Sequence, residues 1–210
     1  MSNKKIYNGV DLSRHNIVTS MKGLKDEGVD FVIIRIGGSN GGHYKDPKFE
    51  LYYNAAKDAG LHVGCYYDTG RGFVNTTAGI NDAVHMLSLL KDHQFDYPIY
   101  MDIETAAPVY RQGITDAAIA FGNVLEANNY FVGIYASDIS GFKDRLQLDR
   151  VKRFSLWVAR YGKKPEYVKD FVIWQKSSTG EYKAMKTKVD LDECYVNFPN
   201  IIKKKHFNGY

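Results

Sequence analysis

A repeated unit constrains the fold of this chain more than any other feature. In each copy a helical pattern ends in Gly or Asn, and an apolar strand begins a few residues later. The copies are Gly28 before residues 31–36, Gly60 before residues 61–67, and Asn128-Asn129 before residues 130–135. Gly or Asn just past a helix is the usual left-handed helix stop. Near-continuous apolar strands that alternate with helices predict a parallel sheet covered on both faces.

The helices and the remaining strands extend this pattern. Apolar residues recur at i, i+3, i+4 and i+7 within residues 49–56, 80–87 and 118–125, as in amphipathic helices. After residue 140, little helical pattern separates three further strands, at residues 155–159, 171–175 and 188–191. With residues 6–11 and 97–104 the total is eight strands, of which about five are followed by helices.

This count predicts an α/β fold, an irregular TIM-like barrel of the form (β/α)5(β)3. An open doubly wound sheet is the alternative, but no glycine-rich phosphate loop follows any strand. No linker divides the 210 residues, so we expect one catalytic barrel over residues 1–200. Residues 201–210 then form a basic tail, either a solvated end or the start of a linker to a module that is not present.

Composition and charge narrow the function classes. There is no run of about 18 apolar residues, so we expect no membrane span. The net charge of +4, from 28 basic and 24 acidic residues, does not indicate a nucleic-acid partner. Cys65 and Cys194 are too far apart for a zinc motif, and buried free thiols are expected. Residues 1–6 contain two lysines but no apolar segment after them, so a standard secretory signal is not predicted.

Two acids end the apolar run 97–104. Asp102 and Glu104 are two positions apart, so in a strand they point to the same face with Cα atoms roughly 6.6 Å apart. Mutual repulsion and unequal desolvation tend to leave one carboxyl ionised and the other protonated near neutral pH. Acid-assisted cleavage of a glycosidic bond requires such a pair. The alternative is a pair of solvated acids at the mouth of a loop.

Other strand ends carry further acids. Asp11 ends the first strand and Asp190 lies within the eighth, and these strands are neighbours in a closed barrel. Because active sites of parallel α/β barrels lie where the strands end, we expect Asp11, Asp102, Glu104 and Asp190 to share one pocket. The candidates for substrate binding are polar or aromatic residues at or near strand ends: Arg35, Tyr66, Tyr67, Tyr135, Trp157, Tyr161 and Gln175. No histidine pair has metal-ligand spacing, and neither a metal nor a cofactor is predicted.

Several segments, in order along the chain from about Ile6 to Tyr195, resemble glycoside hydrolase family 25, the muramidases (lysozymes) of the Chalaropsis type. The matching segments are Gly9-Val10-Asp11-Leu12-Ser13-Arg14-His15-Asn16, Phe31-Val32-Ile33-Ile34-Arg35-Ile36-Gly37, Met101-Asp102-Ile103-Glu104, Gly133-Ile134-Tyr135, Trp174-Gln175 and Val189-Asp190-Leu191.

The resemblance implies a barrel with about five helices that cleaves the β-1,4 bond between N-acetylmuramic acid and N-acetylglucosamine in peptidoglycan. Glu104 matches the family's general acid, and Asp102 matches the acid that orients the substrate's acetamido group. Asp11 and Asp190 match two further acids of the pocket. Asp192 stands where the family often has Asn or another polar residue, and is the second choice after Asp190.

The resemblance also implies a setting at the bacterial cell wall. Without a predicted signal, the protein would be a phage endolysin released through a holin, or an autolysin exported by another route. Members often carry a wall-binding module after the barrel.

Rival functions remain open at this point. A chitinase or N-acetylglucosaminidase could use a similar barrel, although the longer Asp-x-x-Asp-x-Asp-x-Glu signature of family 18 is missing. A non-catalytic glycan-binding protein and a metal-dependent phosphodiesterase are the alternatives from other classes.

Overall fold

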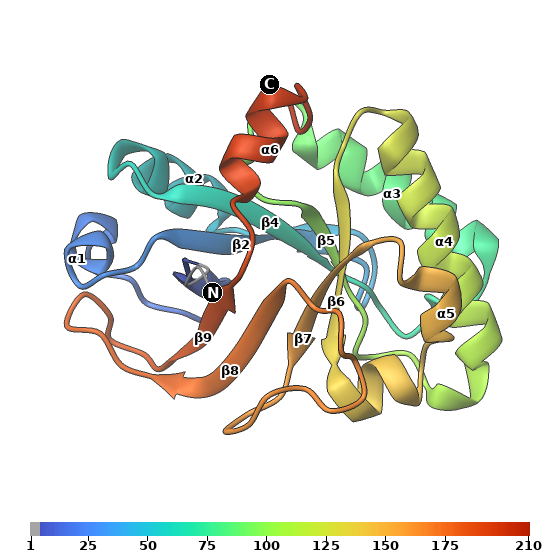
Figure 1. Ribbon diagram of the computed structural model, residues 1–210. Helices are drawn as coiled ribbons and strands as arrows, with labels where there is room; N and C mark the ends of the chain where they lie inside the picture. The colour runs from blue at the N-terminus through green and yellow to red at the C-terminus, as the bar shows by residue number, and fades with distance from the viewer. Residues whose placement is uncertain (1–4) are drawn as a thin grey trace.

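The computed structural model describes residues 5–210. The prediction that residues 1–6 contain no secretory signal therefore falls mostly outside the described residues. Eight strands close into a barrel in the order β1, β9, β8, β7, β6, β5, β4, β2, with β1 paired to β2 (Figure 1). The two-residue strand β3 extends this sheet beside β2. The strands are β1 Tyr7–Leu12, β2 Phe31–Gly38, β3 Tyr44–Lys45, β4 His62–Asp68, β5 Ile99–Asp102, β6 Val132–Ser137, β7 Ser155–Ala159, β8 Ile173–Gly180 and β9 Val189–Cys194.

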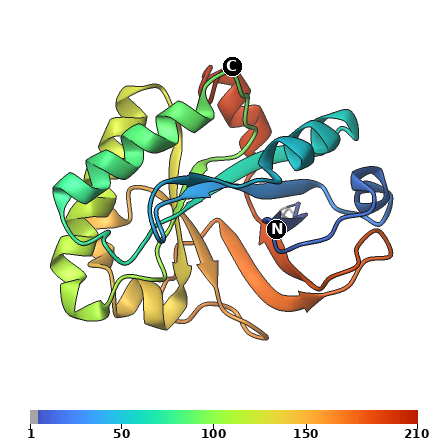
Figure 2. The same ribbon diagram turned by 180° about the vertical axis from the view of Figure 1, so that it is seen from behind.

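Helical segments follow the first five large strands, which confirms the predicted irregular (β/α)5(β)3 barrel. Figures 1 and 2 show the long helices α3 and α4 side by side on the outside of the sheet. Within residues 5–210, no helix is both long and apolar enough to cross a membrane. The helices are α1 Met21–Asp26, α2 Phe49–Asp58, α3 Thr76–Leu90, α4 Arg111–Ala127, α5 Leu148–Val151 and α6 Phe198–Lys204, with a 3-10 turn η1 at Pro108–Tyr110 and a π-helical segment η2 at Asp138–Lys143.

The predicted helix stops lie where the sequence placed them. Gly28, Gly60 and Asn129 follow α1, α2 and α4 and have positive φ angles of 95°, 70° and 65°. At the other ends, the Ser20 and Asn75 side chains accept hydrogen bonds from the first turns of α1 and α3. Such caps are each worth about 1 kcal/mol. Local sequence therefore sets where these helices begin and end.

The last strand differs from a parallel barrel. β9 runs antiparallel to both of its neighbours, β8 and β1. Residues 181–188 between β8 and β9 are too few for a parallel crossover, which needs roughly a dozen residues or more. The chain therefore turns back as a hairpin, and the beginning of β9 lies beside the end of β1.

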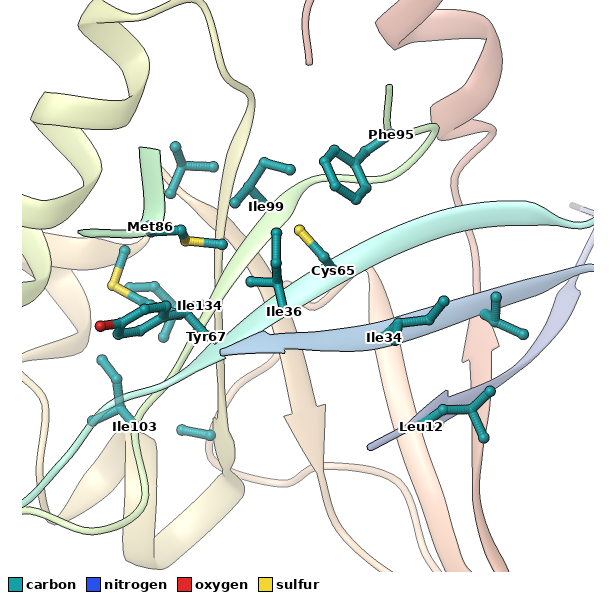
Figure 3. Close-up of a cluster of buried hydrophobic side chains, with 14 of the residues drawn as sticks. Leu12, Ile34, Ile36, Cys65, Tyr67, Met86, Phe95, Ile99, Ile103 and Ile134 are labelled. Atoms are coloured by element: carbon teal, nitrogen blue, oxygen red, sulfur yellow. The ribbon is translucent and has the colours of Figure 1, made fainter. Parts of the chain in front are cut away.

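Two apolar cores hold the barrel. The outer core lies between the sheet and the helices and includes Leu12, Ile34, Ile36, Cys65 and Met86 (Figure 3). The second core fills the inside of the barrel with Phe31, Ile33, Tyr97, Tyr100, Tyr135, Trp157, Ala159, Ile173, Cys194, Phe198 and Ile202.

Glycines on the inner face make room for the aromatic rings. A Cβ atom on Gly9 would lie 2.2 Å from the Phe31 ring, and one on Gly133 would lie 2.2 Å from Tyr100. Each ring thus occupies the space that a side chain on the neighbouring strand would need. The amino-terminal half of the barrel is a packed interior and not a pore.

Residues 198–210 close the amino-terminal end of the barrel, so the predicted boundary at residue 200 falls inside α6 (Figure 1). Phe198 and Ile202 of α6 belong to the inner core. Beyond α6, the buried Asn208 side chain donates to the Tyr97 carbonyl over 2.8 Å, and the Tyr210 hydroxyl donates to Asp96 over 2.8 Å. These contacts attach Asn208 and Tyr210 to the barrel, whereas residues 203–206 between them and the inner core are exposed.

Candidate functional site

A small acidic pocket lies at the carboxyl ends of the parallel strands. Its volume is about 100 Å³, and eight of the eleven predicted site residues line it: Asp11, Tyr66, Asp102, Glu104, Tyr135, Trp157, Gln175 and Asp190. Seven of them come from seven different strands of the barrel, and Glu104 lies two residues beyond the end of β5. None of these eight side chains is basic, so negative charge accumulates there without a cation in the lining.

Backbone contacts hold the end of β5 firmly. Asp102 is the last residue of β5, opposite Asp68 of β4 and Tyr135 of β6. Its carbonyl accepts hydrogen bonds from the Thr69 amide over 3.1 Å and from the Thr69 hydroxyl over 2.6 Å. The Ile103 amide donates to the Tyr135 carbonyl over 3.0 Å. These bonds fix the direction in which the side chains of Asp102 and Glu104 leave the strand.

Asp102 lies deeper in the pocket than Glu104. Its Oδ1 atom is buried and has no hydrogen-bond partner among the described residues. Burial raises the pKa of Asp102 well above its usual value, and the charges of Glu104, Asp68 and Asp11 raise it further, whereas Arg35 opposes the shift. An unpartnered buried carboxylate oxygen is costly, so Asp102 favours the protonated form in the free protein.

Glu104 reaches toward solvent at the rim. Partial withdrawal from water, followed by repulsion from Asp68 and Asp190, raises its pKa, and Arg145 counteracts part of that shift. Because the pKa of both carboxyls is raised, the pair favours a state in which one of the two carboxyls keeps a proton. Such a pair can donate a proton to a bound group and take it back.

A second pair of acids faces the first across the pocket. Asp11 of β1 and Asp190 of β9 are direct partners in the strand register, which confirms that they come close. Asp190 was expected at the end of a parallel strand. It instead lies at the start of β9, and the antiparallel direction of β9 brings it to the same edge. Burial raises the pKa of both groups, and the charge of Asp190 raises that of Asp11 further.

Gln175 orients Asp11. Its Nε2 atom donates to Asp11 Oδ2 over 2.7 Å. Its Oε1 atom accepts from the hydroxyls of Tyr135 over 2.9 Å and Tyr161 over 3.2 Å. A flip of the amide would turn Oε1 towards Asp11 and lose the hydrogen bond that Nε2 donates to it.

Aromatic rings form the floor and one wall of the pocket. The rings of Tyr135 and Trp157 lie 4.4 Å apart, and Tyr66 meets Trp157 edge-on at 6.2 Å. Trp157 is only 1% exposed and its Nε1 atom donates to Asp192 over 2.8 Å. Trp157 thus offers little free surface for stacking, and Tyr66 is the more accessible ring.

Three predicted residues lie outside this pocket. Tyr67 is fully buried in the outer core, where its hydroxyl contacts His85 Nδ1 of α3 over 2.8 Å (Figure 3). Tyr67 does not line the pocket because neighbouring residues in a strand face opposite ways, and Tyr66 takes the inward position. Arg35 is also buried, paired with Asp46 over 2.8 Å and with Asp68 over 3.9 Å.

Tyr161 lines a larger groove beside the pocket. This groove has a volume of about 490 Å³ and runs from Glu104 over the start of η2, along Ser137, Asp138, Ile139, Ser140, Ala159, Arg160 and Tyr161. Tyr161 is 54% exposed and Ile139 is 43% exposed. The groove therefore joins apolar surface to hydroxyls directly beside the acids.

The sequence reasoning missed most of this groove. Asp138 is buried and accepts hydrogen bonds from the amides of Glu166 and Val168 and from the Arg160 side chain, which holds the loop after β7 against η2. Asp138 follows the strand 132–137 directly, so the strand-end rule used for Asp11 and Asp102 could have found it. The other groove residues lie at the ends of β6 and β7, in η2 and in the loop after β7, where no periodic sequence signal marks them.

Among residues 5–210, no three His, Cys, Asp or Glu side chains are arranged to hold a metal ion.

The fold has close counterparts among solved structures. The crystal structure of the CTP1L endolysin is similar with a TM-score of 0.80 and 22% identity, over 94% of this chain and 70% of that one. At this level of identity the likeness shows the fold.

Two curated proteins are similar in sequence. The chain is 26% identical to the autolytic lysozyme of Clostridium acetobutylicum over 186 residues, which cover 88% of this chain and 55% of that protein. It is 28% identical to the probable GH family 25 lysozyme 2 of Dictyostelium discoideum over 181 residues, covering 83% and 82% of the two chains. The chain thus spans about half the length of the first relative and most of the second.

The family model described as glycosyl hydrolases family 25 matches residues 10–185, which include Asp11, Asp102 and Glu104 and end before Asp190. The chain belongs to glycosyl hydrolases family 25.

Proposed function

We propose that this protein is a muramidase that hydrolyses the β-1,4 bond between N-acetylmuramic acid and N-acetylglucosamine in bacterial peptidoglycan. The observation that carries the proposal is the placement of Asp102 and Glu104 at the end of β5, in one acid-lined pocket that raises the pKa of both. Glycosidases use two carboxyl groups on either side of the bond that breaks.

Glu104 is the proposed general acid. It protonates the glycosidic oxygen, which leaves with one sugar. At the same time, the acetamido carbonyl of the other sugar attacks the anomeric carbon of that same sugar. Asp102 holds the acetamido N–H, and water later opens the resulting ring, with net retention at the anomeric carbon. Attack by a carboxylate, or by water that a carboxylate activates, is the alternative mechanism.

Substrate binding would place the proton correctly. In the free protein, deeper burial favours the proton on Asp102 over Glu104. An acetamido N–H that donates to Asp102 stabilises the ionised form of Asp102, because a hydrogen bond to the charged form lowers a carboxyl pKa. The proton is then retained on Glu104, beside the leaving oxygen. Binding of the sugar thereby leaves Asp102 ionised and Glu104 protonated, the state that the proposed reaction requires.

The larger groove suits a sugar chain. Its exposed Tyr161 and Ile139 offer apolar surface to the faces of sugar rings, and Ser137 and Ser140 offer hydroxyls to their edges. The pocket of about 100 Å³ is too small for a whole disaccharide, whereas the groove of about 490 Å³ extends the site past Glu104. We assign the groove to the part of the glycan strand next to the bond that is cleaved.

The experiment is digestion of purified peptidoglycan by the wild type and by Glu104→Gln, with new reducing ends identified by borohydride reduction and mass spectrometry. We expect reduced muramic acid ends from the wild type and a loss of at least about 10²-fold in Glu104→Gln, because general acid catalysis is worth that much. Glu126→Gln, on the outer surface of α4 and paired with Arg153, is the matched control.

The products decide among the rivals. Reduced glucosamine ends would identify an N-acetylglucosaminidase, and cleavage of chitin in place of peptidoglycan would identify a chitinase. Folded protein that binds the glycan and creates no new ends would leave a glycan-binding protein. Equal activity of Glu104→Gln and wild type would overturn the assignment of the acid.

The setting of the reaction is also a proposal. Action on the bacterial cell wall follows from a peptidoglycan substrate. We propose a wall-binding module in a longer parent protein, and either release through a phage holin or export by another route. The neighbouring autolysin LytC of Streptococcus pneumoniae, described as modular, is covered over 47% of its length by this chain.

A further inference from the structure

Asp192 is a third acid beside the Asp11–Asp190 pair. It lies on the inner face of β9, opposite Gly9 of β1 and Gln175 of β8, two residues from Asp190. Asp192 is 1% exposed, whereas Asp190 reaches the pocket. Asp11 is 8% exposed and, in the register of β1 against β9, is the direct partner of Asp190 and the diagonal neighbour of Asp192. Three aspartates of two adjacent strands therefore form one cluster beneath the pocket, which we call the aspartate cluster.

The two oxygens of Asp192 have different surroundings. Oδ1 accepts the Nε1–H of Trp157 over 2.8 Å. Oδ2 is enclosed, and no N–H or O–H of the described residues donates to it. In the strand register, the carboxyl of β1 next to Asp192 is that of Asp11, two residues beyond Gly9, which is the direct partner of Asp192. Since two ionised carboxylates cannot hydrogen-bond to each other, one of them must carry a proton for this contact to be favourable.

Among residues 5–210, no cationic side chain is a partner of Asp11, Asp190 or Asp192. The titratable groups that face Asp192 are Asp11 of β1, Asp190 and Cys194 of β9, Tyr100 of β5, and Tyr182 of the loop before β9. Each of them is either acidic or uncharged at neutral pH. The amide of Gln175 already donates to Asp11, so Asp11 has a fixed donor and Asp192 Oδ2 has none.

We propose that Asp192 is an uncharged, protonated acid whose Oδ2–H donates to Asp11, and that it acts as a positioning residue for Asp11. Asp11 is then held from two sides, by Gln175 and by Asp192. Because Asp192 is uncharged, the negative charge of the aspartate cluster is carried by the residues that line the pocket, including Asp190. Burial, followed by the charge of Asp11, raises the pKa of Asp192 well above its usual value, in agreement with this arrangement. The protonation stands independently of the muramidase assignment, whereas the effect on turnover rests on it.

Two substitutions separate the hydrogen bond from the charge. Asp192→Asn keeps the shape and can donate an amide N–H to Asp11, but it cannot ionise. Asp192→Leu keeps the branched outline but is larger, has no donor, and also removes the acceptor of Trp157. If the proposal holds, Asn replaces the function of the protonated acid and Leu does not.

The direct test is a titration of carboxyl ¹³C signals in protein labelled at aspartate, without substrate. Besides the signal of Asp102, which Asp102→Asn identifies, we expect a further signal of an uncharged acid that persists to neutral pH in the wild type and is missing in both Asp192 variants. The Asp11 signal, identified with Asp11→Asn, should keep its titration midpoint in Asp192→Asn. An Asp192 signal that titrates near the usual carboxyl value of about 4 would overturn the proposal.

The pH dependence of stability and activity gives a second readout. As pH rises above the usual aspartate pKa, the wild type should lose stability relative to Asp192→Asn, because the native state binds a proton that the variant does not need. Asp192→Leu should lower kcat/KM on peptidoglycan by about 10- to 100-fold, the range expected for an unmade buried hydrogen bond, and Asn should restore most of it. Equal pH slopes of wild type and Asp192→Asn would contradict the proposal. Failure of the muramidase assignment would remove only the activity comparison.

Discussion

At the scale of single residues, the site sacrifices stability to hold acids in a desolvated place. Asp102 is the clearest case, since its buried Oδ1 atom has no partner and its pKa is raised. A carboxyl whose pKa is raised by folding stabilises the native state fully only below its usual pKa. That contribution is lost as pH rises through the folded value. Acids that prepare the pocket for proton transfer thus weaken the fold at neutral pH.

Asp102→Asn should therefore be more stable than the wild type at neutral pH, with a smaller difference near pH 3, and should lose at least about 10²-fold in activity. Asparagine keeps the shape without an ionisable group. The free energy of unfolding, measured by denaturant titration at several pH values, checks this. Asp149→Asn on the exposed surface of α5 should show no such trend. A stability difference that is the same at every pH would contradict the explanation.

At the scale of elements, α6 closes the amino-terminal end of the barrel and packs against its inner core. Ile202 is fully buried among the rings and apolar side chains at the amino-terminal ends of the strands. Truncation of such a side chain leaves a cavity that close-packed neighbours fill only partly. The helix thereby contributes to the barrel interior, although it follows the last strand in sequence.

Ile202→Ala should lower the free energy of unfolding by about 2–5 kcal/mol, the usual range for a buried isoleucine. Lys204→Ala, an exposed position on the same helix, serves as the control and should change stability by less than about 0.5 kcal/mol. Both are measured by urea unfolding at a pH where the wild type is two-state. Equal effects of the two substitutions would show that α6 is not part of the core.

The sequence predicts most of the strands and helices correctly, but it does not predict the direction of β9 or the groove. Apolar runs and helix stops such as Gly28 and Asn129 are local signals, so the eight strands and the main helices could be predicted. The direction of β9 depends on the connection of residues 181–188, which is too short for a parallel crossover, and the apolar pattern of the strand carries no information on its direction. Tyr66 and Tyr67 were both predicted to bind substrate, although strand alternation allows only one of them to face inward. The groove along Ser137–Ser140 lies at the end of β6 and the start of η2, a π-helical segment that tertiary contacts such as those of Asp138 hold in place.

At the scale of the whole molecule, the acids and the groove form one continuous surface at one end of the barrel. The chemistry proposed for it needs no metal ion. Peptidoglycan cleavage should therefore be unchanged after dialysis against excess EDTA, as measured by the release of reducing ends. A loss of more than about tenfold that Mg²⁺ restores would favour the metal-dependent alternative.

The filled interior of the barrel has a consequence for how a polymer is cut. Phe31 over Gly9 and Tyr100 over Gly133 close the space beneath the pocket, and α6 covers the far end. A glycan strand cannot thread through the molecule, so it must lie across the mouth and enter from the side. Side entry requires no free chain end. Under the proposed muramidase activity, an enzyme of this shape can attack a strand at internal bonds, and so can break a cross-linked mesh with few events.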